Sequence, residues 1–187
     1  DKVLDEAGQP LAYFINKTMM RINLEHPLLP GAQMTFQVDW HYKINDRMSL
    51  GGRSGYEYFP KDDNYSYTIA QFYPRMAVYD DVEGWQNKQF LGRGEFALSF
   101  GNFEVAMTVP EDFIVGATGT LQNPKDVLTS KEQLRFEKAK QSFEDPVIIV
   151  TQEEAIQKEA HKKRGKATWT FKADSVKDFA FAASRKY

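Results

Sequence analysis

Apolar and polar side chains alternate with a period of two over much of this chain, and this pattern constrains the fold more than any other feature. In residues 34–40, the apolar residues Met34, Phe36, Val38 and Trp40 alternate with polar neighbours. Successive side chains of a strand point to opposite faces of a sheet, so such a run predicts a half-buried strand. A chain dominated by this pattern is expected to be mainly β.

The same alternation recurs in other segments, which are separated by turn-forming residues. It predicts strands at residues 20–24, 96–100, 103–109, 113–121, 168–172 and 179–182, and a short, fully apolar strand at residues 147–150. Gly101 and Asn102 favour a tight turn, so residues 96–109 are expected to form a hairpin. Residues 50–64 lack the alternation and are interpreted as a long loop.

Two segments show the start signal of a helix. Thr129 precedes Glu132 by three residues, and Thr151 precedes Glu154 with the same spacing, which is that of a capping box. The first pair predicts a short surface helix within residues 130–142, with a charge-rich strand as the alternative. The second predicts one or two helical turns. The expected fold class is therefore mainly β, with largely antiparallel, twisted, sandwich-like sheets and one or two short helices.

The phase of the alternation also predicts which side chains form the core. We expect the following residues to be mostly buried: Phe36, Val38, Trp40, Phe96, Leu98, Val105, Met107, Trp169 and Phe181. Large-to-small changes at buried positions of this kind typically cost about 2–5 kcal/mol.

Overall charge and composition exclude several classes of function. The net charge of −2 gives no field that would attract nucleic acid or an anionic membrane. The basic residues at 161–166 have no interleaved aromatic residues, so a solvated turn is favoured over a nucleic-acid patch. No apolar run reaches the roughly 18 residues of a membrane span. Cysteine is absent, which excludes disulfides and thiolate zinc sites.

Residues that could support catalysis are scattered. His26, His41 and His161 lie far apart, and none begins the His-Glu-x-x-His pattern of a helical zinc site, so we expect no metal ligands in this chain. Pairs of adjacent carboxylates occur at residues 62–63, 80–81 and 153–154. Adjacent strand residues point to opposite faces, so these pairs are interpreted as solvated turns rather than as acid–base pairs.

Residues 71–81 are dense in groups that recognise polar ligands. From the residues alone, the favoured interpretation is structural: Gln71 would bind backbone groups, and Arg75 would pair with Asp80 or Asp81. The alternative is a binding site, since the carbonyl of a glutamine can accept a hydrogen bond from an ammonium group.

The order of several segments resembles that of the N-terminal domain of M1-family zinc aminopeptidases. The resemblance extends over residues 10–187 and is specific in residues 71–121 and 168–187. The segments that carry it are residues 71–75 (Gln-Phe-Tyr-Pro-Arg), 79–81 (Tyr-Asp-Asp), 91–96 (Leu-Gly-Arg-Gly-Glu-Phe), 105–110 (Val-Ala-Met-Thr-Val-Pro), 168–173 (Thr-Trp-Thr-Phe-Lys-Ala) and 178–184 (Asp-Phe-Ala-Phe-Ala-Ala-Ser).

This resemblance implies a saddle-like set of antiparallel sheets that forms one domain over residues 1–187. A thermolysin-like catalytic domain is expected after residue 187, and it would carry the zinc as the parent's cofactor. The parent would remove N-terminal residues from peptides, so the expected partners are that catalytic domain and the peptide substrate. This chain alone is expected to hold no cofactor and no catalytic residue. A bacterial periplasmic or cell-envelope location is expected, with the cytoplasm as the alternative.

The resemblance also assigns two substrate-binding residues. Gln71 matches a family glutamine that helps to hold the free α-amino end of the substrate. Tyr73 stands where the family commonly has Glu or Gln, so it keeps an oxygen but loses the carboxylate or amide. The segment that follows is also shorter than in the family.

A second interpretation is a free-standing β-sandwich module that binds carbohydrate or protein. The aromatic residues that would suit stacking on sugars are Tyr56, Tyr58, Trp40, Trp85 and Trp169. Trp40 and Trp169 fall on the apolar phase of their strands, which favours core packing for both. Trp85 follows a glycine in a predicted loop, and its role stays open.

Overall fold

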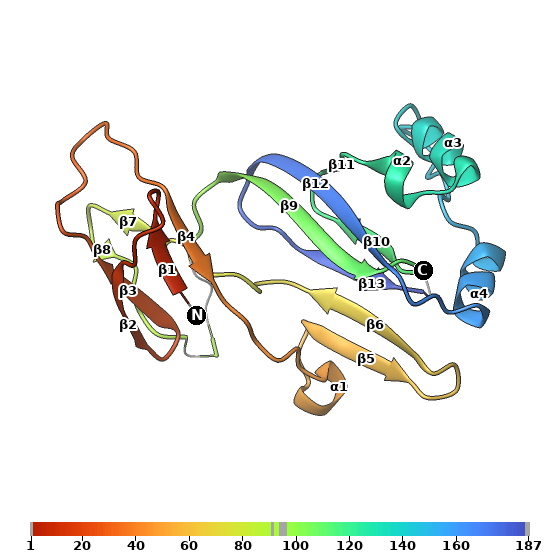
Figure 1. The fold of residues 1–187 in the computed structure, drawn as a ribbon, viewed down its shortest axis with the longest axis horizontal. Helices are drawn as coiled ribbons and strands as arrows, with labels where there is room; N and C mark the ends of the chain where they lie inside the picture. Colours follow the sequence, from red (N-terminus) through yellow and green to blue (C-terminus); the bar gives the residue numbers. More distant parts are fainter. Residues whose placement is uncertain (1, 91, 94–96, 186–187) are drawn as a thin grey trace. The chain divides into compact units, whose positions relative to one another are not determined.

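The computed structural model describes residues 2–90, 92–93 and 97–185, and Figure 1 shows it as a ribbon. Strands hold 37% of the residues and helices 15%, which confirms the predicted mainly-β class. The chain forms two compact units. Unit 1 comprises Asp1–Lys43 and Tyr73–Ser99, and unit 2 comprises Ile44–Phe72 and Phe100–Tyr187.

Within its described residues, unit 1 contains three two-stranded antiparallel sheets. Their strand pairs are β1 (Lys2–Asp5) with β4 (Phe36–Asp39), β2 (Ala12–Asn16) with β3 (Met19–Asn23), and β7 (Tyr79–Asp80) with β8 (Gly84–Trp85). Strands β3 and β4 confirm the predicted strands at residues 20–24 and 34–40. Two-stranded sheets bury little apolar surface, and Val3 is the one buried hydrophobic residue among those described in this unit.

Unit 2 contains two larger antiparallel sheets (Figure 1). The four-stranded sheet has the order β10 (Ile114–Ala117), β13 (Phe181–Ser184), β6 (Asn64–Ile69) and β5 (Gly55–Phe59). The three-stranded sheet has the order β11 (Thr120–Leu121), β12 (Lys166–Val176) and β9 (Gly101–Pro110). The predicted strand at residues 113–121 is therefore divided into β10 and β11.

The alternation on β9 and β12 places one face of each strand in the core of unit 2. Trp169 opposes Met107 across the two strands, and their exposed fractions are 2% and 7%. These two residues confirm the predicted phase. Phe36, Val38, Leu98, Val105 and Phe181 are half-buried, and Phe96 lies outside the described residues.

The structure describes four short helices, whereas the sequence predicts one or two. They are α1 (Arg47–Leu50), α2 (Pro124–Val127), α3 (Ser130–Ala139) and α4 (Gln152–Ala160). Both predicted capping boxes are present, with Thr129 and Thr151 as the N-caps of α3 and α4. Helix α1 has no such box and depends on Asp46, whose carboxylate accepts from the backbone of Met48 and Ser49.

The predicted hairpin at residues 96–109 is wrong. Gly101 and Asn102 do not form a turn; they begin β9, which pairs with β12. The irregularity lies on β12 instead, where Ser175 has a φ of 54° and its N–H donates to the side-chain oxygen of Asn102 at 2.9 Å. A sequence with Gly-Asn is compatible with a turn, but here the long partner strand determines the path.

The predicted loop at residues 50–64 is also wrong, because residues 55–69 form the hairpin of β5 and β6. Gly55 makes this possible. It has a φ of 141°, and a Cβ atom at this position would lie 2.3 Å from the carbonyl oxygen of Asn45. Only glycine permits this approach, which brings the start of β5 against the residues that precede α1.

Two smaller predictions also fail. Residues 147–150 form no strand; instead, the side chain of Arg135 donates to the carbonyl of Ile149 at 2.7 Å. Trp40 follows the last residue of β4, whose strand partner is β1. Its side chain is 46% exposed rather than buried.

Candidate functional site

Gln71 lies two residues beyond the end of β6, on a backbone that is held on its N-terminal side by Ser54. The N–H of Ala70 donates to the Ser54 hydroxyl at 3.1 Å, and that hydroxyl donates to the carbonyl of Ala70 at 3.2 Å. Gln71 itself has a φ of 53° and an exposed side chain. A non-glycine residue at positive φ is uncommon and is found where surrounding contacts impose it.

The residue after Gln71 is anchored as well. The ring of Phe72 packs edge-on against Phe181 of β13, with 5.4 Å between ring centroids and an interplanar angle of 88°. Gln71 therefore projects into solvent between two fixed neighbours. Its carboxamide can both donate and accept hydrogen bonds, and its carbonyl oxygen can accept from an ammonium group.

Tyr73, the second predicted site residue, belongs to unit 1, since the division between the units falls between Phe72 and Tyr73. Its ring is half-buried, and the guanidinium of Arg75 lies over it at 5.7 Å from the centroid. Such a cation–π contact favours a structural role for the ring face. Gln71 and Tyr73 thus lie in different units.

Asp80 has a structural role in unit 1. Its carboxylate accepts from the N–H groups of Val82 and Glu83 at 3.0 and 2.8 Å, and from the amide of Gln86 at 2.6 Å. These bonds close the turn between β7 and β8. They lower the pKa of Asp80, with the Glu83 N–H as the largest cause and the Gln86 amide as the second. This arrangement favours the structural interpretation of the acidic end of residues 71–81.

The other two carboxylate pairs also contain a member with structural bonds. Asp63 accepts from Lys162 at 2.7 Å and from the hydroxyl of Tyr58 at 3.2 Å, and the bond from Lys162 is the main reason that its pKa is lowered. Glu154 closes the capping box of α4 by accepting from the N–H of Thr151. Residues 62–63 lie in the turn between β5 and β6, as predicted, whereas residues 153–154 lie in the first turn of α4, so the turn interpretation is wrong for that pair.

The three histidines are exposed and dispersed. His26 and His41 lie in unit 1 and His161 in unit 2, where the ring of His161 contacts the carbonyl of Gln157 at 3.0 Å. In the part of the chain that the structure describes, no three His, Asp or Glu side chains gather in a way that could hold a metal ion. Among the described helices, none is long and apolar enough to cross a bilayer.

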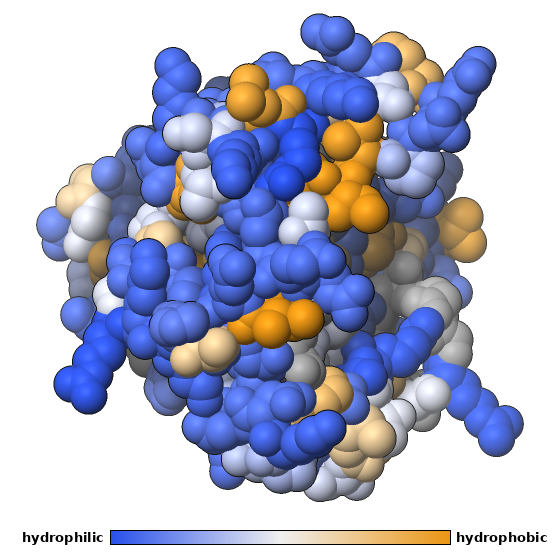
Figure 2. Space-filling model, turned by 90° about the vertical axis from the view of Figure 1, so that its right-hand side faces the viewer, coloured by the Kyte–Doolittle hydropathy of each residue, from blue (hydrophilic) through white to orange (hydrophobic). Residues whose placement is uncertain are grey.

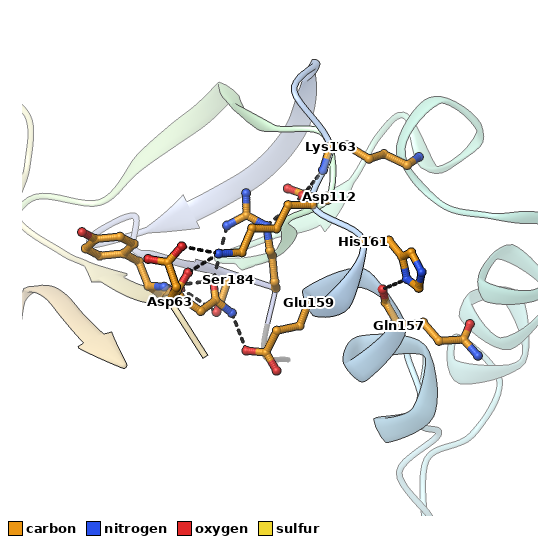
Figure 3. A network of polar contacts seen from close by, with 11 residues as sticks. Asp63, Asp112, Gln157, Glu159, His161, Lys163 and Ser184 are labelled. Atoms are coloured by element: carbon orange, nitrogen blue, oxygen red, sulfur yellow. Dashed lines mark hydrogen bonds and ion pairs between the residues drawn. The ribbon is translucent and has the colours of Figure 1, made fainter. Parts of the chain in front are cut away.

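Unit 2 contains a buried polar network that the sequence does not predict (Figure 3). At its centre, Asp112 accepts from Nε of Arg185 at 2.8 Å and from the N–H of Lys163 at 2.7 Å. The side chains of Asp112 and Arg185 are 1% and 12% exposed. The guanidinium of Arg185 also lies over the ring of Phe113 at 4.6 Å, so this ion pair is enclosed on several sides.

The network continues through Asn64, which is fully buried. Its side-chain oxygen accepts from Arg185 at 3.3 Å, and its amide donates to Glu159 of α4 at 2.8 Å. The bonded members are separated by 51 to 121 residues in the chain, so no local pattern could indicate them. Ser184 of β13 also lies in this network (Figure 3) and donates its hydroxyl to the carbonyl of Tyr65 at 2.8 Å. The position of the network suits bracing the ends of β6 and β13 against α4.

The basic segment at residues 161–166 belongs to the same region. Lys162 pairs with Asp63, the Lys163 backbone binds Asp112, and Gly165 accepts a hydrogen bond from the N–H of Glu111. These contacts with acidic turns support the interpretation as a structural turn over that as a nucleic-acid patch. Comparison of the chain with protein-family models, with curated proteins and with solved structures finds no match.

Proposed function

We propose that this chain is the non-catalytic N-terminal domain of a zinc-dependent aminopeptidase of the M1 family. The chain would form part of the substrate cleft and help to anchor the peptide N-terminus, while the catalytic domain of the same polypeptide would cleave the first residue. The ordered segments that resemble the family support this proposal, and the mainly-β, antiparallel fold is compatible with it.

The observation that carries the proposal is the geometry of Gln71. Ser54 binds both backbone groups of the preceding residue, and Phe72 is packed on Phe181, yet the side chain between them is exposed at positive φ. Residues held in unusual backbone conformations cluster at ligand-binding sites. A carboxamide on a backbone that is already ordered can orient an α-ammonium group without the entropy cost of ordering that backbone.

In the parent, zinc held by the catalytic domain would polarise the scissile carbonyl and activate water. This chain would not perform that chemistry. Its contribution would be to hold the free amino end at a fixed position, with the oxygen of Gln71 as acceptor. We expect the purified chain to show no turnover of aminoacyl chromogenic substrates, with or without added zinc. Chelator-sensitive turnover by pure material would contradict the proposal.

The reading frame beyond Tyr187 tests the proposal at its base. We expect a Gly-x-Met-Glu-Asn-like segment followed by a His-Glu-x-x-His helix and a distal glutamate. A stop codon or an unrelated domain at this point would exclude an M1 aminopeptidase and leave the binding-module interpretation.

The role of Gln71 is tested in the full-length parent by Gln71→Ala. Loss of one hydrogen bond to a charged group costs about 1.5–3 kcal/mol, so kcat/KM should fall roughly ten- to a hundred-fold, with zinc content and melting temperature unchanged. Gln141→Ala, at an exposed glutamine elsewhere in unit 2, is the matched control and should leave kinetics unchanged. Unchanged kinetics in Gln71→Ala beside a lowered melting temperature would show that Gln71 only braces its own segment.

A second candidate function, binding of a neutral carbohydrate, is favoured by exposed aromatic rings in unit 1. Trp40 is 46% exposed and Trp85 53%, and Trp85 packs edge-on against the exposed Tyr79 with 5.3 Å between centroids. Exposed rings of this kind offer faces for stacking on sugars. Titration with neutral oligosaccharides, followed by tryptophan fluorescence, should change the emission of the wild type and not that of Trp85→Ala.

A further inference from the structure

Helix α3 buries a charged side chain and exposes an apolar one, and helix α4, whose buried residue is Ala155, also exposes an apolar side chain. The buried residue of α3 is Glu132, which is 1% exposed. The apolar residues Leu134 of α3 and Ile156 of α4 are 74% and 55% exposed. A surface helix normally turns its apolar side chains to the core and its charged side chains to water. The exposed apolar residues of these two helices are therefore not explained by the folding of unit 2.

The charged residues on the inner side join the two helices reciprocally. Lys158 of α4 donates to Glu132 of α3 at 2.8 Å, and Arg135 of α3 donates to Glu154 of α4. Each glutamate also closes the capping box of its own helix. The same two glutamates thus serve both N-terminal caps and both ion pairs, and they join the inner sides of the two helices.

The exposed side of α3 carries a leucine between two lysines. Lys131, Leu134 and Lys138 are spaced by three and four residues, so they lie on one side of the helix. All three are exposed, and neither lysine has an ion-pair partner among the described residues. By contrast, Glu137 of the same helix is paired with Lys140 at 2.7 Å. We refer to Lys131, Leu134 and Lys138 as the α3 face.

The exposed side of α4 carries the opposite charge. Glu153 and Ile156 are three residues apart and exposed, and Glu153 has no ion-pair partner in the described part of the chain. We refer to these two residues as the α4 face. The segment between the helices adds Phe143 and Ile148, which are 93% and 69% exposed. Figure 2 views the side on which Figure 1 draws α3 and α4, and it shows apolar patches separated by hydrophilic surface.

We propose that the α3 face of one copy of this chain binds the α4 face of a second copy, and that the contact occurs twice about a two-fold axis. Leu134 would pack against Ile156 of the partner subunit, and the lysines of the α3 face would lie against the glutamate of the α4 face. Two α3 faces would repel each other through their positive charges, and two α4 faces through their negative charges. An α3 face and an α4 face are complementary in charge, and the contact between them would be apolar at its centre. An isologous contact of this type requires one surface to supply both halves.

The experiment is sedimentation equilibrium of the purified chain over a range of concentrations. We expect a reversible dimer. Lys131→Glu with Lys138→Glu should raise its dissociation constant at least about tenfold, because both faces then carry negative charge. Adding Glu153→Lys to this variant should restore the dimer to within about threefold of the wild type, since the charges are then exchanged. Leu134→Ser should weaken the dimer without changing net charge.

Matched controls separate this contact from other association. Lys61→Glu with Lys125→Glu makes the same change of net charge at exposed positions outside both faces, and Phe14→Ser removes an exposed apolar side chain of unit 1, 64% exposed. Both should leave the dissociation constant unchanged. A wild type that is monomeric throughout would overturn the proposal and leave the faces to a different partner. A dimer that is insensitive to the lysine reversals, or not restored by Glu153→Lys, would equally overturn it.

Discussion

The two units of this chain are built from similar strands but differ in what those strands bury. Among the residues that the structure describes, all but one of the buried hydrophobic side chains lie in unit 2, and Val3 is the exception. Apolar residues of unit 1 such as Phe14, Leu29 and Val82 are 64%, 68% and 87% exposed. Strand pairing alone does not make a core; a sheet must also be wide enough to bury one of its faces.

The difference has a thermodynamic consequence. In unit 2, β12 pairs with two neighbours and β6 with two others, so apolar side chains on these strands are enclosed from several directions. In the described part of unit 1, each strand pairs with one neighbour. Burial of apolar area is the main favourable term in folding, so unit 2 is expected to supply most of the free energy of unfolding and unit 1 little.

The largest expected effect is at the centre of unit 2. Trp169→Ala should lower the free energy of unfolding by about 3–5 kcal/mol, because this indole is 2% exposed. Trp85→Ala in unit 1, at a side chain that is 53% exposed, should change it by no more than about 0.5 kcal/mol. Urea unfolding followed by far-ultraviolet circular dichroism measures both. Equal losses for the two variants would refute the proposed difference between the units.

Ion pairs should show the same contrast. Asp112→Ala leaves Arg185 nearly buried without its carboxylate partner, and removal of one member of a buried pair costs about 3–5 kcal/mol. Lys88→Ala breaks a pair with Glu83 in unit 1 whose side chains are 71% and 48% exposed, and it should leave the unfolding midpoint unchanged. If Asp112→Ala is as stable as the wild type, the buried network does not brace unit 2.

One identical substitution in both units gives a sharper comparison. Val115→Ala in unit 2 and Val3→Ala in unit 1 remove the same atoms from residues that are 5% and 2% exposed. Lost transfer free energy is about 1.6 kcal/mol in each case. The rigid surroundings of Val115 should add a cavity term, whereas the narrow sheet around Val3 can collapse. Hydrogen exchange of β10 and β1 amides reads each unit separately. A larger effect for Val3→Ala would reverse the ranking of the units.

How well the alternation predicts burial depends on where a residue lies in its strand and on the width of the sheet. Met107 and Trp169 are buried as predicted because they lie in long, paired strands, where alternation reports burial directly. Trp40 has the same alternation but lies beyond the end of a strand in a narrow sheet, so its phase does not report burial. Capping boxes are predicted correctly because the signal is local, within four residues.

Long-range features could not be predicted from the sequence. Asp112 and Arg185 are 73 residues apart and show no shared pattern, and the hairpin of β5 and β6 depends on a close backbone approach at Gly55. For the candidate site, the family resemblance assigns Gln71. The sequence does not predict the hydrogen bonds between Ser54 and Ala70 that hold the preceding residue, because they join two separate segments. Fold class follows from periodicity, whereas the support of a site depends on topology.

The smallest expected effect concerns stability in acid, and it compares one carboxylate with a lowered pKa in each unit. The N–H of Thr151 is the largest cause that lowers the pKa of Glu154 below its ordinary value, and Arg135 adds to it. A carboxylate whose pKa is lowered on folding stabilises the folded state above its unfolded pKa. That contribution is lost as pH falls through the lowered, folded pKa. Glu154→Gln keeps an acceptor for Thr151 but removes the charge. The variant should therefore melt slightly below the wild type at neutral pH and converge with it in acid, as the wild-type carboxyl takes up its proton.

Asp80→Asn is the counterpart in unit 1, where hydrogen bonds from Glu83 and Gln86 lower the pKa of Asp80. Because unit 1 contributes little to the global transition, Asp80→Asn should change the exchange of β7 and β8 amides and leave the melting temperature unchanged at every pH. Melting curves and amide exchange, both recorded from neutral to acid pH, check the pair. A constant difference between Glu154→Gln and the wild type across this range would show that its effect is steric rather than electrostatic.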